Sequence, residues 1–480
     1  MSLRHKLGID APVAYVFLGR IANIVGSTGT VLLIARTLTP VEQGYYYTLL
    51  SLVALQIVFE LGFSFVIQQL AAHESVHLRF GKHGAMDGTT SAQARLASVL
   101  RLSMRWYTVA AVGMVVLIAP LGSLFFAHHA AEHVQVDWRG PWLCAICASA
   151  FSLWCMPFYA FLEGCGQVRA VAALRLRQAL ASTALAWTAL LLHHGLYAPA
   201  LVIAAQIAVG LLFLFGNRRL LLALLRVPLQ DNAVRWRADV WPFQWRIAIS
   251  WMCTYFTMQV FVPILFALRG AVEAGQMGMS LSITGYMTVL ALSWTSTKAT
   301  PFGNLIARGE LHALDQLFQR SMRQSLGAFA ALACTVCLGA AALPAFAPHL
   351  AARMLPAHLL AVLALGAGAN CAVQCMATLL RSFKREPFLV LSLAAAAVTL
   401  SLGSLAATRW GTAGAVFSYL TAMGGVALPS AWTILRRERR SYLARIAATG
   451  KANQYPHALP IDWESETAPF LTPEEVQPQI

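Results

Sequence analysis

Long apolar runs separated by short polar segments make up most of the chain. Twelve of these runs have about the 20 residues that an α-helix needs to cross the hydrocarbon core of a bilayer. This length and composition predict an all-α polytopic membrane protein with twelve transmembrane helices. We place the runs near residues 12–35, 45–71, 98–127, 141–162, 171–193, 197–216, 244–268, 278–299, 324–347, 357–380, 386–408 and 412–435.

A short motif in the first half of the chain is echoed in the second half. Val41-Glu42-Gln43-Gly44 lies between the first two apolar runs, and Val272-Glu273-Ala274-Gly275 precedes the eighth. The offset between them, 231 residues, is close to half of the 480-residue chain. Parallel repeats with a site near the membrane midplane are a known plan of transporters. The echo therefore predicts two pseudo-symmetric six-helix bundles with a polar pathway between them.

The segments outside the two halves differ in composition from the apolar runs. Arg218 to Arg226 is short, basic and rich in leucine, which suits a helix lying along the membrane interface. Arg436 to Arg440 is basic, and the chain beyond Lys451 is Pro-rich and acidic. Both basic segments are expected to contact anionic lipid headgroups. We divide the chain into an N-terminal bundle (1–216), a cytoplasmic or interfacial linker (217–243), a C-terminal bundle (244–435) and a cytoplasmic tail (436–480).

Composition and charge agree with a membrane protein and predict its orientation. The sequence is 58% hydrophobic and only 11% charged, and its mean hydropathy is +0.63. The net charge of +15 is explained by topology, because 29 of the 35 Lys and Arg residues fall on the side of the N-terminus and five on the other. The positive-inside rule then places both termini in the cytoplasm. No nucleic-acid motif supports nucleic acid as a partner.

Two charged residues fall inside predicted spans and are candidate functional groups. A charge at the centre of a bilayer costs roughly 2.5–3.5 kcal/mol or more, so Arg20 and Glu60 are expected to face a bundle interior or a wet cavity. The guanidinium of Arg20 has paired donors that suit a phosphate or pyrophosphate group. Glu60 is either the counter-ion of Arg20 or a proton or cation carrier. Lys298 either adds a second positive charge or is an ordinary interfacial lysine.

Neutral polar and aromatic residues in the spans are the remaining candidates. Gln56 and Gln259 offer hydrogen bonds either to neighbouring helices or to sugar hydroxyls. Tyr286 and Trp294 either pack against other helices or stack on the face of a sugar. The sequence alone leaves both alternatives open for each residue.

The sequence contains no catalytic arrangement, so neither enzymatic activity nor a cofactor is expected. There is no phosphate-cradling glycine loop, no nucleophile elbow and no zinc-helix motif. The pairs Cys144/Cys147 and Cys334/Cys337 have the spacing of a metal or redox motif, but neither is followed by a second pair or by suitably spaced histidines. We therefore expect no metal site.

Several motifs resemble those of a known family. Leu38-Thr39-Pro40-Val41-Glu42-Gln43-Gly44-Tyr45-Tyr46-Tyr47 is similar to the opening of polysaccharide and lipopolysaccharide export proteins of the MATE-like (multidrug/oligosaccharidyl-lipid/polysaccharide) superfamily. The resemblance extends from about Ala11 to Leu435. It is carried further by Phe59-Glu60-Leu61-Gly62, by Leu162-Glu163-Gly164-Cys165-Gly166-Gln167 and by Glu273-Ala274-Gly275-Gln276-Met277-Gly278.

The resemblance implies a V-shaped pair of bundles in the bacterial cytoplasmic membrane. It further implies a flippase that moves a polyprenyl-(di)phosphate-linked oligosaccharide outward by alternating access, through a cationic central cavity that Arg20 fits. Glycosyltransferases or a polymerase would then be partners. Two alternatives remain: a cation-coupled multidrug antiporter of the same fold, for which Glu60 is the central carboxylate, and a non-transporting scaffold for glycosyltransferases.

Overall fold

The structure, a computed structural model, describes residues 11–76, 78–80, 86–129, 136–228, 234–236, 240–383 and 389–449. Inside these ranges the side chains of some residues, including Arg20, are not described. The described chain is almost entirely helical. Its single small sheet pairs β1 (Leu78–Phe80) with β2 (Met86–Gly88), antiparallel, with Leu78 opposite Gly88.

The helices form two groups, which we call the first lobe and the second lobe. The first lobe contains α2 (Ala11–Thr37), α3 (Pro40–Val53), α4 (Gln56–Glu60), α5 (Phe63–Ser75), α6 (Thr90–His129), α7 (Arg139–Gly164), α8 (Val168–Leu191), η2 (Gly195–Tyr197) and α9 (Ala198–Gly216). A short helix, α10 (Arg218–Arg226), follows. The second lobe contains α11 (Trp241–Met258), α12 (Phe261–Arg269), α13 (Ala271–Ser296), α14 (Ala299–Arg308), α15 (Leu311–Phe346), α16 (Pro348–Ala351), α17 (Ala357–Ser382), α18 (Leu389–Leu420), the π-helical η4 (Thr421–Ala427) and α19 (Leu428–Thr449).

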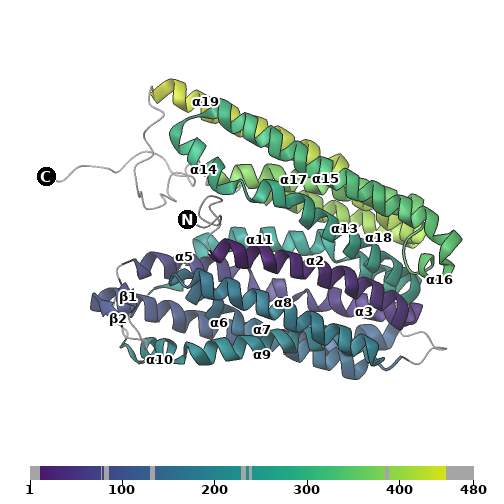
Figure 1. Cartoon of the computed structure of the whole chain (residues 1–480), viewed down its shortest axis with the longest axis horizontal. Coiled ribbons are helices and arrows are strands. Elements are labelled where there is room, and N and C mark those ends of the chain that lie inside the picture. The colour runs from purple at the N-terminus through teal and green to yellow at the C-terminus, as the bar shows by residue number, and fades with distance from the viewer. Residues whose placement is uncertain are drawn as a thin grey trace, which may run out of the picture.

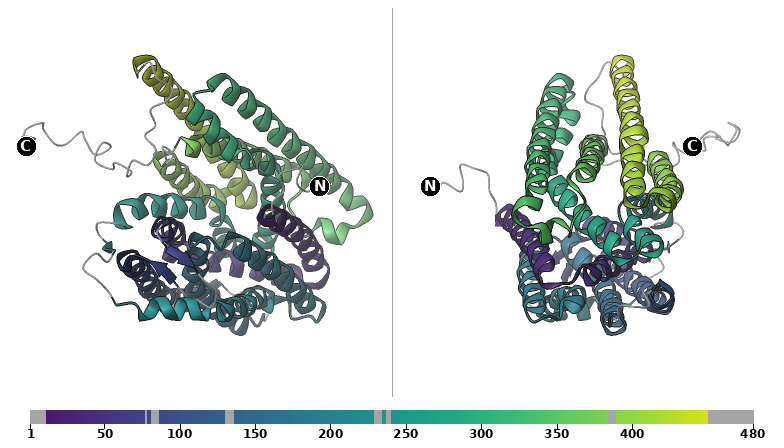
Figure 2. Two further views of the ribbon diagram at one scale, coloured as in Figure 1. Left: turned by 60° about the vertical axis from the view of Figure 1, so that its left-hand side comes forward. Right: turned by 90° about the vertical axis from the view of Figure 1, so that its right-hand side faces the viewer.

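The two lobes meet at one end and diverge toward the other, except that α11 of the second lobe lies along the first lobe and contacts α4 and α5 (Figure 1). Helices α2 and α3 of the first lobe contact α13, and α3 also contacts α12. Figure 1 shows these contacts at the right-hand end of the molecule, near α16, and the further views in Figure 2 show the same divergence. The start of α2, the end of α19, the β1–β2 pair and α14 all lie at the diverging end (Figure 1). The architecture is therefore V-shaped.

The membrane-spanning character is confirmed, and the predicted number of spans is partly accounted for. Six described helices or helical runs are long and apolar enough to cross a membrane, and up to eight are if each of two bent pairs counts as one span. One run, Val390–Ser441, has 52 residues, about twice the length that a single crossing needs. Twelve crossings result if this run crosses twice and if α2, α8 and α13 also cross, so the count of twelve stays a prediction.

Local sequence signals set several helix ends. Thr39 caps α3: the Glu42 amide donates to its hydroxyl (3.2 Å), and the Thr39 amide donates to the Glu42 carboxylate (2.8 Å). Gly270, with φ 93° and ψ 178°, separates α12 from α13, and only glycine adopts this conformation readily. Gly411, with φ 56°, breaks α18 into two arms, one before and one after this residue. The loops between consecutive spans can therefore be short.

The segment between the lobes packs on the first lobe. Leu220, Leu221 and Leu224 of α10 are buried, and α10 contacts α6. The Arg101 guanidinium on α6 donates to the carbonyls of Leu225 (2.7 Å) and Val227 (2.6 Å). These bonds fix the C-terminal end of α10, which would otherwise leave carbonyl groups without partners.

Candidate functional site

The junction of the lobes is a seam of close backbone contacts between α3 and α13. A Cβ atom built on Gly44 would lie 1.9 Å from the carbonyl oxygen of Ala271, and one built on Gly275 would lie 2.9 Å from the Gly44 nitrogen. A Cβ on Gly278 would lie 2.4 Å from the Cβ of Tyr47. These distances are far below van der Waals contact, so glycine is needed at all three positions. We call Gly44, Ala271, Gly275 and Gly278 the glycine seam.

Gln43 fastens the seam with hydrogen bonds from one lobe to the other. It is 1% exposed, and its Nε2 donates to the carbonyls of Gly275 (3.0 Å) and Arg353 (2.8 Å). The two echoed motifs of the sequence are thus in direct contact. Sequence reasoning noted the echo but missed this contact. A usable signal was the pair Gly275 and Gly278, because small residues at helical spacing mark close packing of membrane helices.

Tyr286 and Gln259, two of the predicted site residues, lie near this junction. Tyr286 on α13 is half-buried and lies close to Tyr46 and Tyr47 of α3. Gln259 caps the end of α11, and its side-chain oxygen accepts a hydrogen bond from Ser51 on α3 (3.4 Å). Both residues therefore border the contact between the lobes.

Gln56 and Glu60 lie together in the first lobe, on the short helix α4. Glu60 is 5% exposed and accepts a hydrogen bond from Ser64. Leu61 and Gly62, both with positive φ, break the helix directly after Glu60. Gln56 accepts a hydrogen bond from Ser149 on α7 (2.5 Å). The break thus ends α4 directly after Glu60, whose carboxylate is buried.

Trp294 lies farther along α13 and Lys298 lies just after the end of α13, both toward the diverging end. Trp294 is 45% exposed, and Lys298 is half-buried at the N-cap of α14. At 1.5 Å per residue, they lie about 12 and 18 Å beyond Tyr286 along the helix direction. The predicted residues thus form three groups: Gln56 with Glu60, Gln259 with Tyr286, and Trp294 with Lys298. Arg20 belongs to α2, but its side chain lies outside the described residues, so its pairing with Glu60 stays a prediction.

Sequence reasoning missed a polar pocket, which we call the first-lobe pocket because every wall except α11 of the second lobe belongs to the first lobe. Its volume is about 330 Å³, and its walls come from α5, α7, α8, α9 and α11. Glu163 and Arg175, which line it, form an ion pair of 2.6 Å. The sequence presented Arg175 as one cytoplasmic cation among many and Glu163 as part of a motif. No local sequence pattern predicts that two residues twelve positions apart, on different helices, contact each other.

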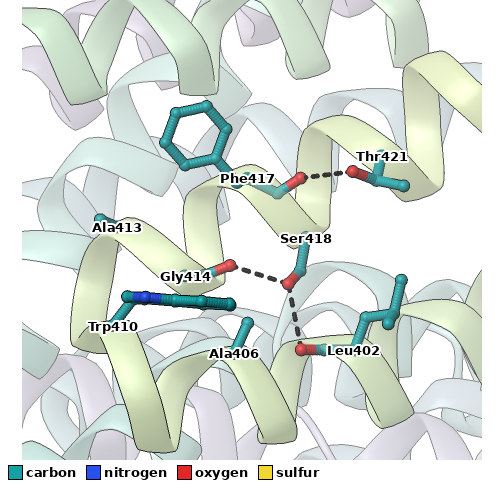
Figure 3. Close-up of a pocket in the computed structure, with 8 residues that line it drawn as sticks. All are labelled: Leu402, Ala406, Trp410, Ala413, Gly414, Phe417, Ser418 and Thr421. Atoms are coloured by element: carbon teal, nitrogen blue, oxygen red, sulfur yellow. Dashed lines mark hydrogen bonds between the residues drawn. The ribbon is translucent and has the colours of Figure 1, made fainter.

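A second pocket is apolar and lies between the two arms of α18. It has a volume of about 490 Å³ and is lined by residues from Leu402 to Thr421. The Ser418 hydroxyl lies within donating distance of the carbonyls of Leu402 (3.1 Å) and Gly414 (2.7 Å). The Thr421 hydroxyl donates to the Phe417 carbonyl (2.9 Å), as Figure 3 shows. Both hydroxyls donate within the helices, so the pocket presents mainly hydrocarbon and suits an apolar chain better than a polar ligand.

Among the described residues, no group of three or more His, Cys, Asp or Glu side chains could hold a metal ion. The described site is instead made of hydrogen-bonding groups, aromatic rings and one ion pair.

Comparison with solved structures identifies the fold. A mutant of the Vibrio cholerae MATE transporter VcmN matches 90% of this chain and 97% of its own, with a TM-score of 0.57 and 14% identity. The lipid II flippase MurJ in an inward closed conformation matches 88% of this chain and 87% of its own, with a TM-score of 0.57 and 11% identity. An inward-facing multidrug resistance MATE transporter of the MOP superfamily matches 87% of this chain and 99% of its own, with a TM-score of 0.51 and 14% identity.

These likenesses confirm the predicted all-α, multi-span membrane fold, which is the fold of the MATE and MOP transporter structures. No protein-family model and no curated protein matches the sequence. Because structures described as drug transporters and as a lipid flippase match equally well, the fold does not distinguish between these two functions.

Proposed function

We propose that this protein is a flippase that moves a polyprenyl-(di)phosphate-linked oligosaccharide from the inner to the outer leaflet of a bacterial cytoplasmic membrane. The observation that carries the proposal is that the two lobes join at the glycine seam and along α11, and diverge toward the end where the described basic segments lie (Figure 1). A pathway that opens between two lobes accepts a headgroup while the lipid tail stays in the bilayer.

The distribution of charge supports an anionic substrate. With both termini in the cytoplasm, the diverging end faces the cytoplasm, where the lipid-linked glycan is assembled. Arg20 belongs to α2, and this helix contacts α8 of its own lobe and α13 of the other. An Arg–phosphate contact is charge-assisted and bidentate. Arg20 and Lys298 would hold the phosphate, and Gln56, Gln259, Tyr286 and Trp294 would contact the sugars.

The experiment is a deletion of the gene in its host followed by complementation. Deletion should leave a lipid-linked oligosaccharide on the inner leaflet, identified by mass spectrometry, and the wild-type gene should clear it. Arg20→Ala should export about 10- to 100-fold less glycan, the loss expected for a charge-assisted phosphate contact. Arg36→Ala is the matched control, because Arg36 is exposed at the other end of the same helix. Normal glycan export in the deletion strain would refute the proposal.

The two alternatives predict other results. For a cation-coupled drug antiporter, Glu60 would carry the coupling ion, because it is a buried carboxylate inside a span. Glu60→Gln would then abolish drug resistance while leaving lipid-linked glycan levels unchanged. For a scaffold of glycosyltransferases, Arg20→Ala would leave export intact, and removal of residues 436–480 would abolish it.

A further inference from the structure

We propose that the first-lobe pocket binds one uncharged sugar ring. The assignment rests on the proposed function in one respect only, namely that the natural source of the ring is the glycan of the transported lipid. The pocket itself is defined by its size, its charge balance, its hydrogen-bonding groups and its aromatic walls.

The ion pair at the pocket leaves little net charge for a ligand. Glu163 and Arg175 neutralise each other at 2.6 Å, with the Glu163 side chain 13% exposed. The Arg175 side chain is 64% exposed, but an anion bound to it would also meet the Glu163 carboxylate, and a cation bound to Glu163 would meet the guanidinium, so a charge of either sign gains little. A neutral ligand can instead bond to both groups, because the carboxylate and the guanidinium each have unused hydrogen-bonding positions. The ion pair therefore favours a polar, uncharged molecule.

Several polar groups that line the pocket are free to bond such a molecule. Gln68 on α5 and Ser152 on α7 make no side-chain hydrogen bond to the described residues. The Tyr159 hydroxyl also makes no hydrogen bond to the described residues, but it is covered by Gly210 and is therefore not open to a ligand. A ring with several hydroxyls both donates and accepts, so it can satisfy amide, hydroxyl and carboxylate groups together.

Two aromatic rings line the same pocket. Trp251, on the first helix of the second lobe, is 37% exposed, and Phe65 on α5 is 45% exposed. The C–H face of a sugar packs on the face of an aromatic ring, and its hydroxyl edge remains available to the polar groups. The volume of about 330 Å³ lies at the lower end of small-molecule sites, roughly 300–1,000 Å³. It suits one ring better than a long oligosaccharide.

The apolar pocket between the arms of α18 is a useful contrast. Its hydroxyls already donate to backbone carbonyls (Figure 3). The first-lobe pocket differs because it combines free polar groups with an ion pair and aromatic walls. A polar ligand is therefore expected in the first-lobe pocket and not in the α18 pocket.

The test is direct binding of free sugars to the full chain in phosphatidylcholine nanodiscs, measured by saturation-transfer NMR. The probes are glucose, galactose and N-acetylglucosamine, with glucuronate and inorganic pyrophosphate as charged comparisons. At least one neutral sugar should bind with a dissociation constant in roughly the millimolar range, as expected for a ligand of about a dozen heavy atoms. Gln68→Leu should weaken this binding about fivefold, the share of one neutral hydrogen bond.

The matched control is Gln69→Leu, because Gln69 is the next residue on the same helix, is exposed, and does not line the pocket. It should bind as the wild type does. Trp251→Phe keeps an aromatic face and should retain binding, whereas Trp251→Ala should lose it. A variant that elutes as an aggregate on size exclusion is replaced by Ser152→Ala, for which the same weakening is expected.

Three results would overturn the assignment: no neutral sugar gives a saturable signal, Gln69→Leu weakens binding as much as Gln68→Leu does, or pyrophosphate or glucuronate binds more tightly than every neutral sugar. Failure of the flippase proposal is distinguishable. If deletion of the gene causes no accumulation of lipid-linked glycan but a neutral sugar binds with the expected Gln68 dependence, the pocket assignment stands and the transport proposal falls.

Discussion

Adding a methyl group at Gly44 should open the junction between the lobes. The Cβ of Gly44→Ala would lie 1.9 Å from the carbonyl oxygen of Ala271, whereas an ordinary C···O contact is about 3.3 Å. The neighbouring atom belongs to the backbone, so a side-chain rotation cannot relieve the clash. Helices α3 and α13 must therefore separate by roughly 1.4 Å.

The cost of this separation follows from the contacts around the seam. The Gln43 amide donates at 3.0 and 2.8 Å, so a shift of this size breaks bonds worth about 1 kcal/mol each. Overpacking of a tight contact adds about 1–3 kcal/mol. The gain in helix propensity from glycine to alanine returns up to about 1 kcal/mol. The closed junction should lose about 2–4 kcal/mol, which makes the open form at least about 30-fold more populated.

Cysteine labelling measures this opening. Met279, which is 3% exposed and whose sulfur lies 4.0 Å from the Gln43 amide nitrogen, is replaced by cysteine. The background lacks the three exposed native cysteines, Cys144, Cys147 and Cys334. A water-soluble maleimide should react at least about tenfold faster when Gly44→Ala is added, because labelling follows the population of the open form.

The matched control is Gly285→Ala on α13, since a Cβ at Gly285 would have no neighbour within 4 Å. This change should gain helix propensity without altering the labelling rate. The reasoning fails if Gly44→Ala labels no faster than its parent, or if Gly285→Ala accelerates labelling equally.

Three further changes test other contacts. Arg101→Ala should release the end of α10 and speed tryptic cleavage after Arg226, because it removes two charge-assisted bonds worth roughly 1.5–3 kcal/mol each. The control is Arg105→Ala, since Arg105 is exposed one turn along the same helix, and this variant should be cleaved at the wild-type rate. Equal cleavage rates for the two variants would contradict the prediction. Gly270→Ala should lower unfolding stability by about 1–3 kcal/mol because of its φ of 93°, and an unchanged thermal midpoint would count against strain there. Gln43→Leu should cost about 1–3 kcal/mol, also measured by thermal unfolding, and a neutral effect would mean that the bonds across the junction contribute nothing.

The order and type of the elements could be predicted from sequence because they depend on local composition. A run of about 20 apolar residues must form a helix in lipid, since the bilayer offers no partners for free backbone groups. The predicted run at 45–71 lies within the segment that forms α3, α4 and α5, and the break between α4 and α5 depends on Leu61 and Gly62 in the left-handed region. A hydropathy pattern does not report such a break, because both residues are as apolar as their neighbours.

The candidate site was less predictable because it depends on contacts between distant segments. The sequence singled out Glu60, which is only 5% exposed in the structure. It gave no role to Gln43, whose bonds reach residues 232 and 310 positions away.

The sequence by itself determined that this chain is an all-α membrane protein, and it predicted two related halves with most of the basic residues on one side of the membrane. These properties follow from the transfer of side chains and backbone groups between water and lipid, which each segment experiences separately. The tertiary structure alone decided that the echoed motifs touch at a glycine seam, and that Glu163 and Arg175 form an ion pair on a polar pocket. Both depend on which faces of distant helices meet, and that is settled by close packing of the whole molecule.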